Sequence, residues 1–220
     1  MKRKIVTTAD GSKTIYLEGW DEYYHSKHGA VQEAYHVFIK NGLSLFSRSP
    51  ISILEMGYGT ALNALITCME AERTGLHIHY TGVEAYPISP KELGQLNYIK
   101  ELKAEEFQSV FEKMHECPWE EDYRISNNFV LHKKRMDFLS IDAKALFDLV
   151  YFDAFGARVQ PELWTETMFE KMFRALKKDG LLVTYAAKGD VRRAMQSVGL
   201  IVERLPGPPG KREMLRARKP

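Results

Sequence analysis

A glycine-rich loop between an apolar run and a helical pattern is the feature that most restricts the fold of this chain. Residues 51–61 read Ile-Ser-Ile-Leu-Glu-Met-Gly-Tyr-Gly-Thr-Ala, and a helical pattern continues to Glu72. A strand, a glycine loop and a helix in this order bring the backbone of a parallel α/β sheet close to a nucleotide-like ligand. By itself the loop is equally compatible with an ordinary tight turn, so its meaning depends on the residues that come after it in the chain.

Details of the loop distinguish between two classes of cofactor. The dinucleotide-binding fingerprint is G-x-G-x-x-G, but Leu62 stands where the third glycine would be. Glu55, two residues before Gly57, is instead typical of enzymes that use S-adenosylmethionine (SAM). A carboxylate at this position can attract the cationic methionine end of SAM, whereas a pyrophosphate carries no such charge. The loop therefore favours SAM over a hydride carrier.

Composition places few further limits on the chain. Its 220 residues are 45% hydrophobic and 27% charged, which is typical of one soluble domain. The net charge of +2 permits an anionic partner without requiring one. The two cysteines and seven histidines show no metal-ligand spacing, so no metal is expected. Neither a signal peptide nor an apolar run of about 20 residues is visible, and we expect a cytoplasmic protein without a membrane span.

The order of the elements predicts an α/β fold with an N-terminal hairpin extension. Strands are expected at 51–56, 77–83, 128–134, 146–152, 181–185, 200–205 and 212–218, and helices at 30–40, 60–73, 90–99, 102–115, 165–178 and 189–198. Alternating strands and helices imply a doubly wound, mostly parallel sheet, and the last strand, turn and strand add an antiparallel edge. This suits the seven-stranded, Rossmann-like sheet of class I SAM-dependent methyltransferases.

Two parts of one structural unit are expected. Residues 1–42 would form a hairpin, a lid over the ligand and a helix, all packed on the core. Residues 43–220 would form the SAM-binding methyltransferase domain. The aromatic segment 20–29 is the candidate lid, although it could also be a plain structural cover.

Acidic residues follow four of the predicted strands: Glu55, Glu84, Asp137 and Asp153. Ligands of open α/β sheets bind at the carboxyl ends of the strands, so these four side chains are expected to meet at one site. Any one of them alone is more often a helix N-cap or a solvated loop residue. Four acids in register with four strands make that interpretation much weaker.

Each acid has a physical role in a SAM site. Glu55 would hold the ammonium of the methionine part, and Glu84 would accept both ribose hydroxyls. Asp137 would accept the adenine amino group while a neighbouring apolar side chain packs on the ring, and Asp153 would lie beside the transferable methyl. The predicted cofactor-binding residues are Glu55, Gly57, Tyr58, Gly59, Thr60, Glu84, Ala85, Met136, Asp137, Phe138 and Asp153.

Several longer motifs occur in a fixed order along the chain. They are T-A-D-G-S at 8–12, Y-H-S-K-H-G-A at 24–30, E-M-G-Y-G-T at 55–60, Y-F-D-A-F at 151–155, P-E-L-W at 161–164, G-D-V-R-R at 189–193 and P-G-P-P-G-K-R-E-M at 206–214. Together they resemble the methyltransferase half of the bacterial tRNA-modifying MnmC enzymes. The resemblance spans residues 8–216, and the D-A-F and P-E-L-W motifs are more specific than the glycine loop.

Two positions depart from the family pattern, and one half of the fused enzymes is missing. Ala61 stands where the family often has a third glycine, and Lys188 where a small or hydroxyl residue is expected. A second glycine-rich unit for a flavin is not visible, so this chain would supply only methyl transfer. A separate FAD-dependent oxidase, or another enzyme, could then supply the substrate.

The resemblance implies a definite reaction. The chain would be a SAM-dependent N-methyltransferase that acts on the 5-aminomethyl group of (2-thio)uridine at the wobble position, in the anticodon stem-loop of tRNA. The product would be 5-methylaminomethyl(-2-thio)uridine. One alternative is a small-molecule methyltransferase or an aminopropyltransferase-like enzyme on the same sheet. Another is a nucleotide- or RNA-binding module that has lost catalysis.

Candidate residues for the substrate follow from this reaction. Only a neutral amine attacks the methyl group, so Asp153 is expected to bind and orient the amine, unless it merely fixes its loop. Tyr24 could add a hydroxyl acceptor over the site. Phe155 or Trp164 could stack on the uracil ring, although Trp164 is equally a candidate for packing at a helix start.

Cations are needed to attract RNA. The candidates are Lys27, Lys188, Arg192, Arg193, Lys211 and Arg212. Scattered Lys and Arg residues are more often solvated surface. The pair Lys211 and Arg212 lies beside a glycine- and proline-rich turn that could hold a phosphate, so these two and Lys188 are the predicted substrate-binding cations.

Overall fold

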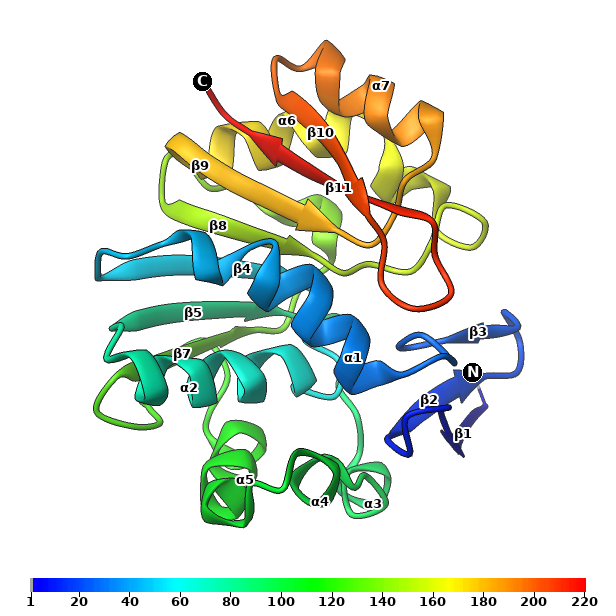
Figure 1. The fold of residues 1–220 in the computed structure, drawn as a ribbon, viewed down its shortest axis with the longest axis vertical. Coiled ribbons are helices and arrows are strands. Elements are labelled where there is room, and N and C mark those ends of the chain that lie inside the picture. Colours follow the sequence, from blue (N-terminus) through cyan, green and yellow to red (C-terminus); the bar gives the residue numbers. More distant parts are fainter. Residues whose placement is uncertain (1) are drawn as a thin grey trace.

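The computed structural model describes residues 2–220, and its centre is one twisted sheet with helices on both faces (Figure 1). Within these residues the sheet has eight strands in the order β10-β11-β9-β8-β4-β5-β7-β6. Their bounds are β4 Ile51–Met56, β5 Ile78–Val83, β6 Asp122–Arg124, β7 Phe129–Lys134, β8 Phe147–Phe152, β9 Leu176–Thr184, β10 Ile201–Pro206 and β11 Glu213–Arg218. The five strands from β9 to β7 are parallel, while β10, β11 and β6 run antiparallel to their neighbours.

The fold class predicted from the sequence is confirmed. All seven expected strands are present, and their order is that of a doubly wound sheet with an antiparallel edge. The eighth strand, β6, was not predicted, because its three residues are all exposed and show no apolar alternation. It extends the sheet beyond β7 by pairing with residues 130–132.

The helices cover the two faces of the sheet in separate groups. The bounds are α1 Ala30–Ala34, continued by a π-helix Tyr35–Lys40, then α2 Leu62–Thr74, α3 Pro90–Leu93, α4 Tyr98–Leu102, α5 Gln108–Glu116, α6 Glu166–Ala175 and α7 Gly189–Ser197. Side chains from α1, α2, α4 and α5 pack on one face, and side chains from α6 and α7 on the other. Strand β4 supplies both cores, with Ile51 and Ile53 on one face and Leu54 and Met56 on the other.

The predicted helix at 165–178 is too long. Helix α6 ends at Ala175, and strand β9 begins at the next residue. Leu176 is fully buried and pairs with Phe147 of β8, so burial in the sheet outweighs the helix-end signal at Asp179 and Gly180. The expected helix at 90–99 is likewise divided, into α3 and α4, with Gly94 as the C-cap of α3.

The N-terminal segment forms a second, small sheet. It contains the expected hairpin, β1 Arg3–Thr7 and β2 Lys13–Leu17, and a third strand, β3 Glu22–Tyr23, that was not predicted. This sheet lies beside the carboxyl ends of the parallel strands, next to the loop between β10 and β11 (Figure 1). Within residues 2–220, every helix is too short or too polar to cross a membrane.

Candidate functional site

A cavity of about 1880 Å³ opens at the carboxyl ends of the parallel strands, under the N-terminal sheet. Its walls come from the loops that follow β4, β5, β7 and β8, from residues 20–28 and from the loop between β10 and β11. The four acids that follow the strands in sequence all line this one cavity: Glu55, Glu84, Asp137 and Asp153. The structure therefore brings together the set that the strand pattern predicted.

The glycine loop after β4 turns sharply against the end of β8. The N–H groups of Gly57 and Tyr58 donate to the carbonyl of Val83 at 3.1 and 3.0 Å. Gly57 has a φ of +103°, and a Cβ at this position would lie 2.7 Å from the carbonyl oxygen of Asp153. Ala61, in the place of the family's third glycine, has a φ of +62°, the left-handed conformation that glycine adopts most easily.

The contact at Gly57 gives a matched pair of variants. Gly75 ends α2 with a φ of +73° and has open space around it, so Gly75→Ala should cost only backbone strain, about 1–2 kcal/mol. Gly57→Ala adds a collision with backbone, and we expect a loss of about 3 kcal/mol in the free energy of unfolding. Urea unfolding of both variants checks this. Only Gly57→Ala should also weaken SAM binding in calorimetry, and equal effects of the two variants would contradict the role of Gly57.

Glu84 is fixed by backbone donors on both of its oxygens. The N–H of Gly59 donates to Oε2 at 3.0 Å, and the N–H of Tyr86 donates to Oε1 at 2.8 Å. The residue is 9% exposed and lines the cavity. Each carboxylate oxygen retains a second lone pair for a donor from a ligand. This geometry fits the paired acceptor predicted for the ribose hydroxyls.

Asn63, in the first turn of α2, joins two of the acids. Its Nδ2 donates to Oε1 of Glu55 and to Oδ2 of Asp153, both at 2.9 Å. Burial raises the pKa of Glu55 and of Asp153 well above the usual carboxyl range. Sequence reasoning missed Asn63. The available signal was a polar residue at the start of an otherwise apolar helix pattern.

Glu55 offers a free acceptor deep in the site. It is 1% exposed, and its Oε2 has no hydrogen bond of ordinary geometry among residues 2–220, although the neighbouring Tyr80 hydroxyl acts on its pKa. An unpaired buried oxygen is costly unless a ligand satisfies it. The ammonium of SAM is such a donor, the glycine loop allows close approach of its backbone, and the cavity exceeds the volume of a typical ligand pocket, ~300–1,000 Å³. The residues present therefore fit SAM, with room for a second substrate.

Tyr24 lies over the glycine loop. A Cβ at Gly59 would be 3.3 Å from its ring, and the ring meets Phe155 edge to face with centroids 5.2 Å apart. Burial raises the pKa of Tyr24, and the charges that act on its hydroxyl belong to Arg3, Glu84 and Glu92. The structure thus favours Tyr24 as a cover on the Glu84 side of the cavity. Its predicted role as an acceptor for the substrate amine gains no support.

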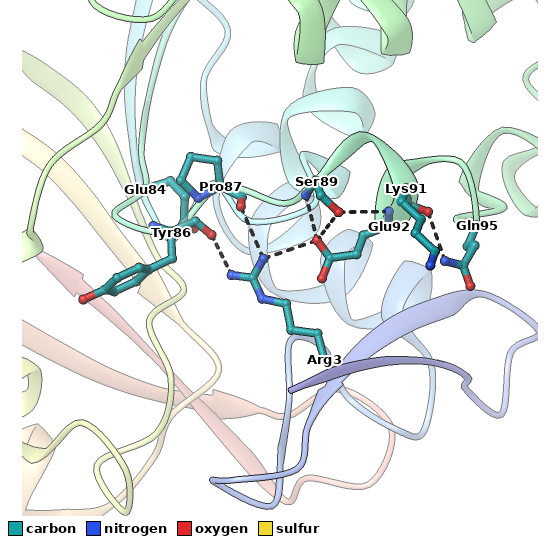
Figure 2. A network of polar contacts seen from close by, with 8 residues as sticks. All are labelled: Arg3, Glu84, Tyr86, Pro87, Ser89, Lys91, Glu92 and Gln95. Carbon is teal, nitrogen blue, oxygen red and sulfur yellow. Dashed lines mark hydrogen bonds and ion pairs between the residues drawn. The ribbon is translucent and has the colours of Figure 1, made fainter. Parts of the chain in front are cut away.

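Arg3 fastens the N-terminal sheet to the loop after β5 (Figure 2). Its guanidinium donates to the carbonyl oxygens of Tyr86 and Pro87 at 2.7 and 3.2 Å and pairs with Glu92 at 3.4 Å. Glu92 is itself fixed by the N–H and hydroxyl of Ser89, both at 2.7 Å. Because this loop begins at Glu84, Arg3 helps to hold the N-terminal sheet in place beside Glu84.

The T-A-D-G-S motif has a structural role. Asp10 accepts hydrogen bonds from Thr8, from Ser12 and from the N–H of Gln32 in α1. Burial opposes its ionisation, but these hydrogen bonds outweigh burial and lower the pKa of Asp10. A Cβ at Gly29 would lie 2.7 Å from an oxygen of Asp10. The motif therefore joins the hairpin, the lid and α1.

Three predicted substrate residues lie outside the cavity. Trp164 is 6% exposed, and its indole N–H donates to the carbonyl of Phe155 at 2.7 Å, so it packs in the core and cannot stack on a base. Lys188 is exposed at the N-cap of α7. Arg212 is exposed, with its guanidinium 3.9 Å from a carboxylate oxygen of Glu213. Phe155, by contrast, does line the cavity.

Among the predicted residues, Lys211 has the position that differs most from the one expected. It lines the cavity instead of extending to solvent with Arg212. Its Nζ lies 2.5 Å from Oε1 of Glu33 and 3.8 Å from the centroid of the Tyr185 ring. The Lys211 ammonium is thus held by Glu33 and Tyr185 in this structure, and phosphate binding by its turn stays a prediction. Sequence reasoning missed both Glu33 and Tyr185, because neither follows a strand end with a recognisable motif.

The remaining predicted residues lie in the loops that follow β4, β5 and β7. Asp137 lines the cavity, and its Oδ1 also accepts the N–H of Leu139 at 2.8 Å as the N-cap of a short 3₁₀ turn. Phe138, Ala85 and Thr60 line the cavity, whereas Met136 packs against the core. Tyr58 contributes backbone to the loop while its ring packs on Gly82.

Comparison with known proteins identifies the family of this chain. A family model described as S-adenosyl-L-methionine-dependent methyltransferase matches residues 95–220. The tRNA 5-methylaminomethyl-2-thiouridine biosynthesis bifunctional protein MnmC of Hydrogenovibrio crunogenus is 27% identical over 97% of this chain, and that of Aromatoleum aromaticum is 29% identical over 98%. These matches cover 33% and 35% of the relatives, so the chain spans about a third of their length.

Two solved structures share the fold. The crystal structure of MnmC2 from Aquifex aeolicus superposes with a TM-score of 0.77 at 24% identity, over 98% of this chain and 70% of that one. Spermidine synthase from Thermotoga maritima superposes with a TM-score of 0.62 at 14% identity, over 99% of this chain and 68% of that one. The likeness to MnmC predicted from the motifs is confirmed, and the chain belongs to the family of SAM-dependent methyltransferases.

Proposed function

We propose that this chain transfers the methyl group of SAM to the 5-aminomethyl group of (2-thio)uridine at the wobble position of tRNA. The observation that carries the proposal is the position of Asp153, a carboxyl group held by Asn63 at the end of β8 inside a cavity with room for a second substrate. The bifunctional relatives are named for the biosynthesis of 5-methylaminomethyl-2-thiouridine in tRNA, which supports the same substrate.

The chemistry requires a group that accepts an ammonium and then its proton. When bound, SAM supplies a methyl group activated by a positive sulfur. Glu55 and Glu84 would hold its methionine and ribose parts, while Asp153 would bind the substrate ammonium. Loss of one proton frees the nitrogen lone pair, a nitrogen–carbon bond forms, and the carbon–sulfur bond breaks. Burial raises the pKa of Asp153, which makes its carboxylate a better proton acceptor than an exposed one.

The direct test is to incubate the purified chain with SAM and tRNA that carries 5-aminomethyl-2-thiouridine. Mass analysis of the digested nucleosides should show conversion to the methylaminomethyl form. Parallel reactions with the free nucleoside and with small diamines test the alternative, a small-molecule methyltransferase or aminopropyltransferase-like enzyme. Turnover of a small amine with none on tRNA would overturn the proposal in favour of that alternative.

The salt dependence of tRNA binding tests the exposed cations near the cavity. Lys27 and Arg212 are both exposed on loops next to the cavity, so replacing both by Ala should weaken tRNA binding. The slope of log K against log salt should become less steep by about 1 for each phosphate that the variant no longer binds. Arg124→Ala, on the edge strand β6, is the matched control and should keep the parental slope. An unchanged slope in the double variant would exclude these two residues from phosphate binding.

A further inference from the structure

The ammonium of Lys211 occupies a built cation site inside the cavity. Its Nζ lies 2.5 Å from Oε1 of Glu33 and 3.8 Å over the centroid of the Tyr185 ring. A carboxylate together with an aromatic face is a typical arrangement for binding an ammonium. The three residues come from distant parts of the chain, namely α1, the end of β9 and the loop between β10 and β11.

The two groups that bind this ammonium are held independently of it. The side chain of Glu33 is 8% exposed, and its Oε2 accepts the N–H of Ser26 at 2.8 Å. The hydroxyl of Tyr185 donates to the carbonyl of Ala154 at 2.8 Å, directly after Asp153. The carboxylate and the ring would therefore stay in place if Lys211 left.

The site lies within electrostatic reach of Asp153. After burial, the charge of Glu33 is the largest influence that raises the pKa of Asp153, and the charge of Lys211 lowers it. Glu33, Lys211 and Asp153 line the same cavity as Glu55, whose buried Oε2 has no hydrogen bond of ordinary geometry among residues 2–220. The ammonium of Lys211 therefore offsets part of the negative charge of these carboxylates.

The Lys211 side chain can leave its contacts with Glu33 and Tyr185. It lies on an irregular loop, between Gly210, which has a φ of +82°, and the exposed Arg212, whereas Glu33 belongs to α1 and Tyr185 directly follows β9. The Lys211 side chain is 31% exposed, so a path to solvent already exists. Its end group, a primary ammonium on a methylene, is the same chemical group as the 5-aminomethyl substituent of the proposed substrate.

We propose that Glu33 and the ring face of Tyr185 complete, together with Asp153, the subsite for the substrate ammonium. Lys211 fills this subsite in the free protein and leaves it when the substrate binds. The inference rests on the proposed function for the identity of the amine, but the subsite itself would take any primary alkylammonium. Exchange of one ammonium for another keeps the charge beside Asp153 constant. Glu33 is thus a specificity residue that selects a cationic substrate.

Nuclear magnetic resonance of the parent protein with ¹³C-labelled lysine tests the exchange directly. Because Nζ lies over the Tyr185 ring, the Lys211 Hε signals should be shifted upfield by the ring current, and Lys211→Arg assigns them. Addition of 5-aminomethyluridine in the presence of S-adenosylhomocysteine should return the signals to their usual position. Signals that stay shifted at saturation would show that Lys211 is a fixed structural ion pair and overturn the inference.

Variants test the same exchange through affinity, measured by calorimetry with the same nucleoside. Glu33→Gln keeps the shape and the acceptor for Ser26 but weakens the binding of both competing ammonium groups, so its effect is measured in the Lys211→Met background. There we expect it to weaken binding at least tenfold, the effect of removing a hydrogen bond to a charged group. Lys211→Met removes the internal competitor and should strengthen binding several-fold. Lys178→Met, on the exposed opposite end of β9, is the matched control. Weaker binding in Lys211→Met would overturn the inference.

A second probe separates this inference from the proposed function. Propylammonium carries the primary ammonium without the nucleoside. Suppose that propylammonium moves the Lys211 signals in the parent protein but not in Glu33→Gln, while 5-aminomethyluridine moves them in neither protein. In that case the ammonium subsite stands and the wobble-uridine substrate fails. If neither amine moves the signals, the subsite fails, whatever the activity on tRNA.

Discussion

Asp153→Asn is expected to lower the rate of methyl transfer by about two to four orders of magnitude, the usual contribution of a general base. The amide keeps the shape of the side chain, and its oxygen can still accept from Asn63, but it cannot take a proton or attract an ammonium. SAM affinity should change little. Single-turnover kinetics with saturating SAM, together with calorimetry, measure the two effects separately.

The pH dependence of the same variant gives a further check. Burial raises the pKa of Asp153, so the parental rate should fall on the acid side at a pH above the usual carboxyl range. The protonated carboxyl group can neither attract the ammonium nor accept its proton. This acid limb should disappear in the residual activity of Asp153→Asn. Asp142→Asn, a change at an exposed aspartate, is the control. A near-parental rate in Asp153→Asn would remove Asp153 from the chemistry.

Glu84→Ala is expected to weaken SAM binding about 10- to 150-fold. The range corresponds to the loss of one hydrogen bond to a charged group, about 1.5–3 kcal/mol, at about 1.4 kcal/mol for each factor of ten. The change also leaves the N–H groups of Gly59 and Tyr86 without their acceptor, which loosens the glycine loop. Calorimetry with SAM measures the effect.

Two further variants test whether the loss of SAM affinity is specific to the Glu84 carboxylate. Glu84→Gln keeps one acceptor oxygen for the backbone or the ribose and should show an intermediate affinity. Glu116→Ala, on the exposed side of α5, should bind SAM like the parent. If Glu84→Ala bound SAM with parental affinity, the assignment of Glu84 to the ribose would be wrong, although its part in holding the loop could still be seen in unfolding experiments.

Most of the sheet could be predicted because its signals are local. Strand β4 alternates between two buried faces, and the glycine loop and α2 follow it directly in the chain. The same local rule, an acid just after a strand, found Glu84 and Asp153. Another local rule, the helix-end signal, failed at Asp179 and Gly180, which lie within a strand because Leu176 is buried against β8.

The sequence by itself determined the fold class, the cofactor and the end of the sheet where the ligand binds, because strand period, loop composition and chain order are properties of neighbouring residues. Tertiary structure alone decided which side chains complete the site. Asn63 joins two acids from different strands, and Lys211 meets Glu33 across 178 positions of the chain. Such contacts depend on how helices and loops pack over the strand ends, and packing of distant segments leaves no periodic signal in the sequence.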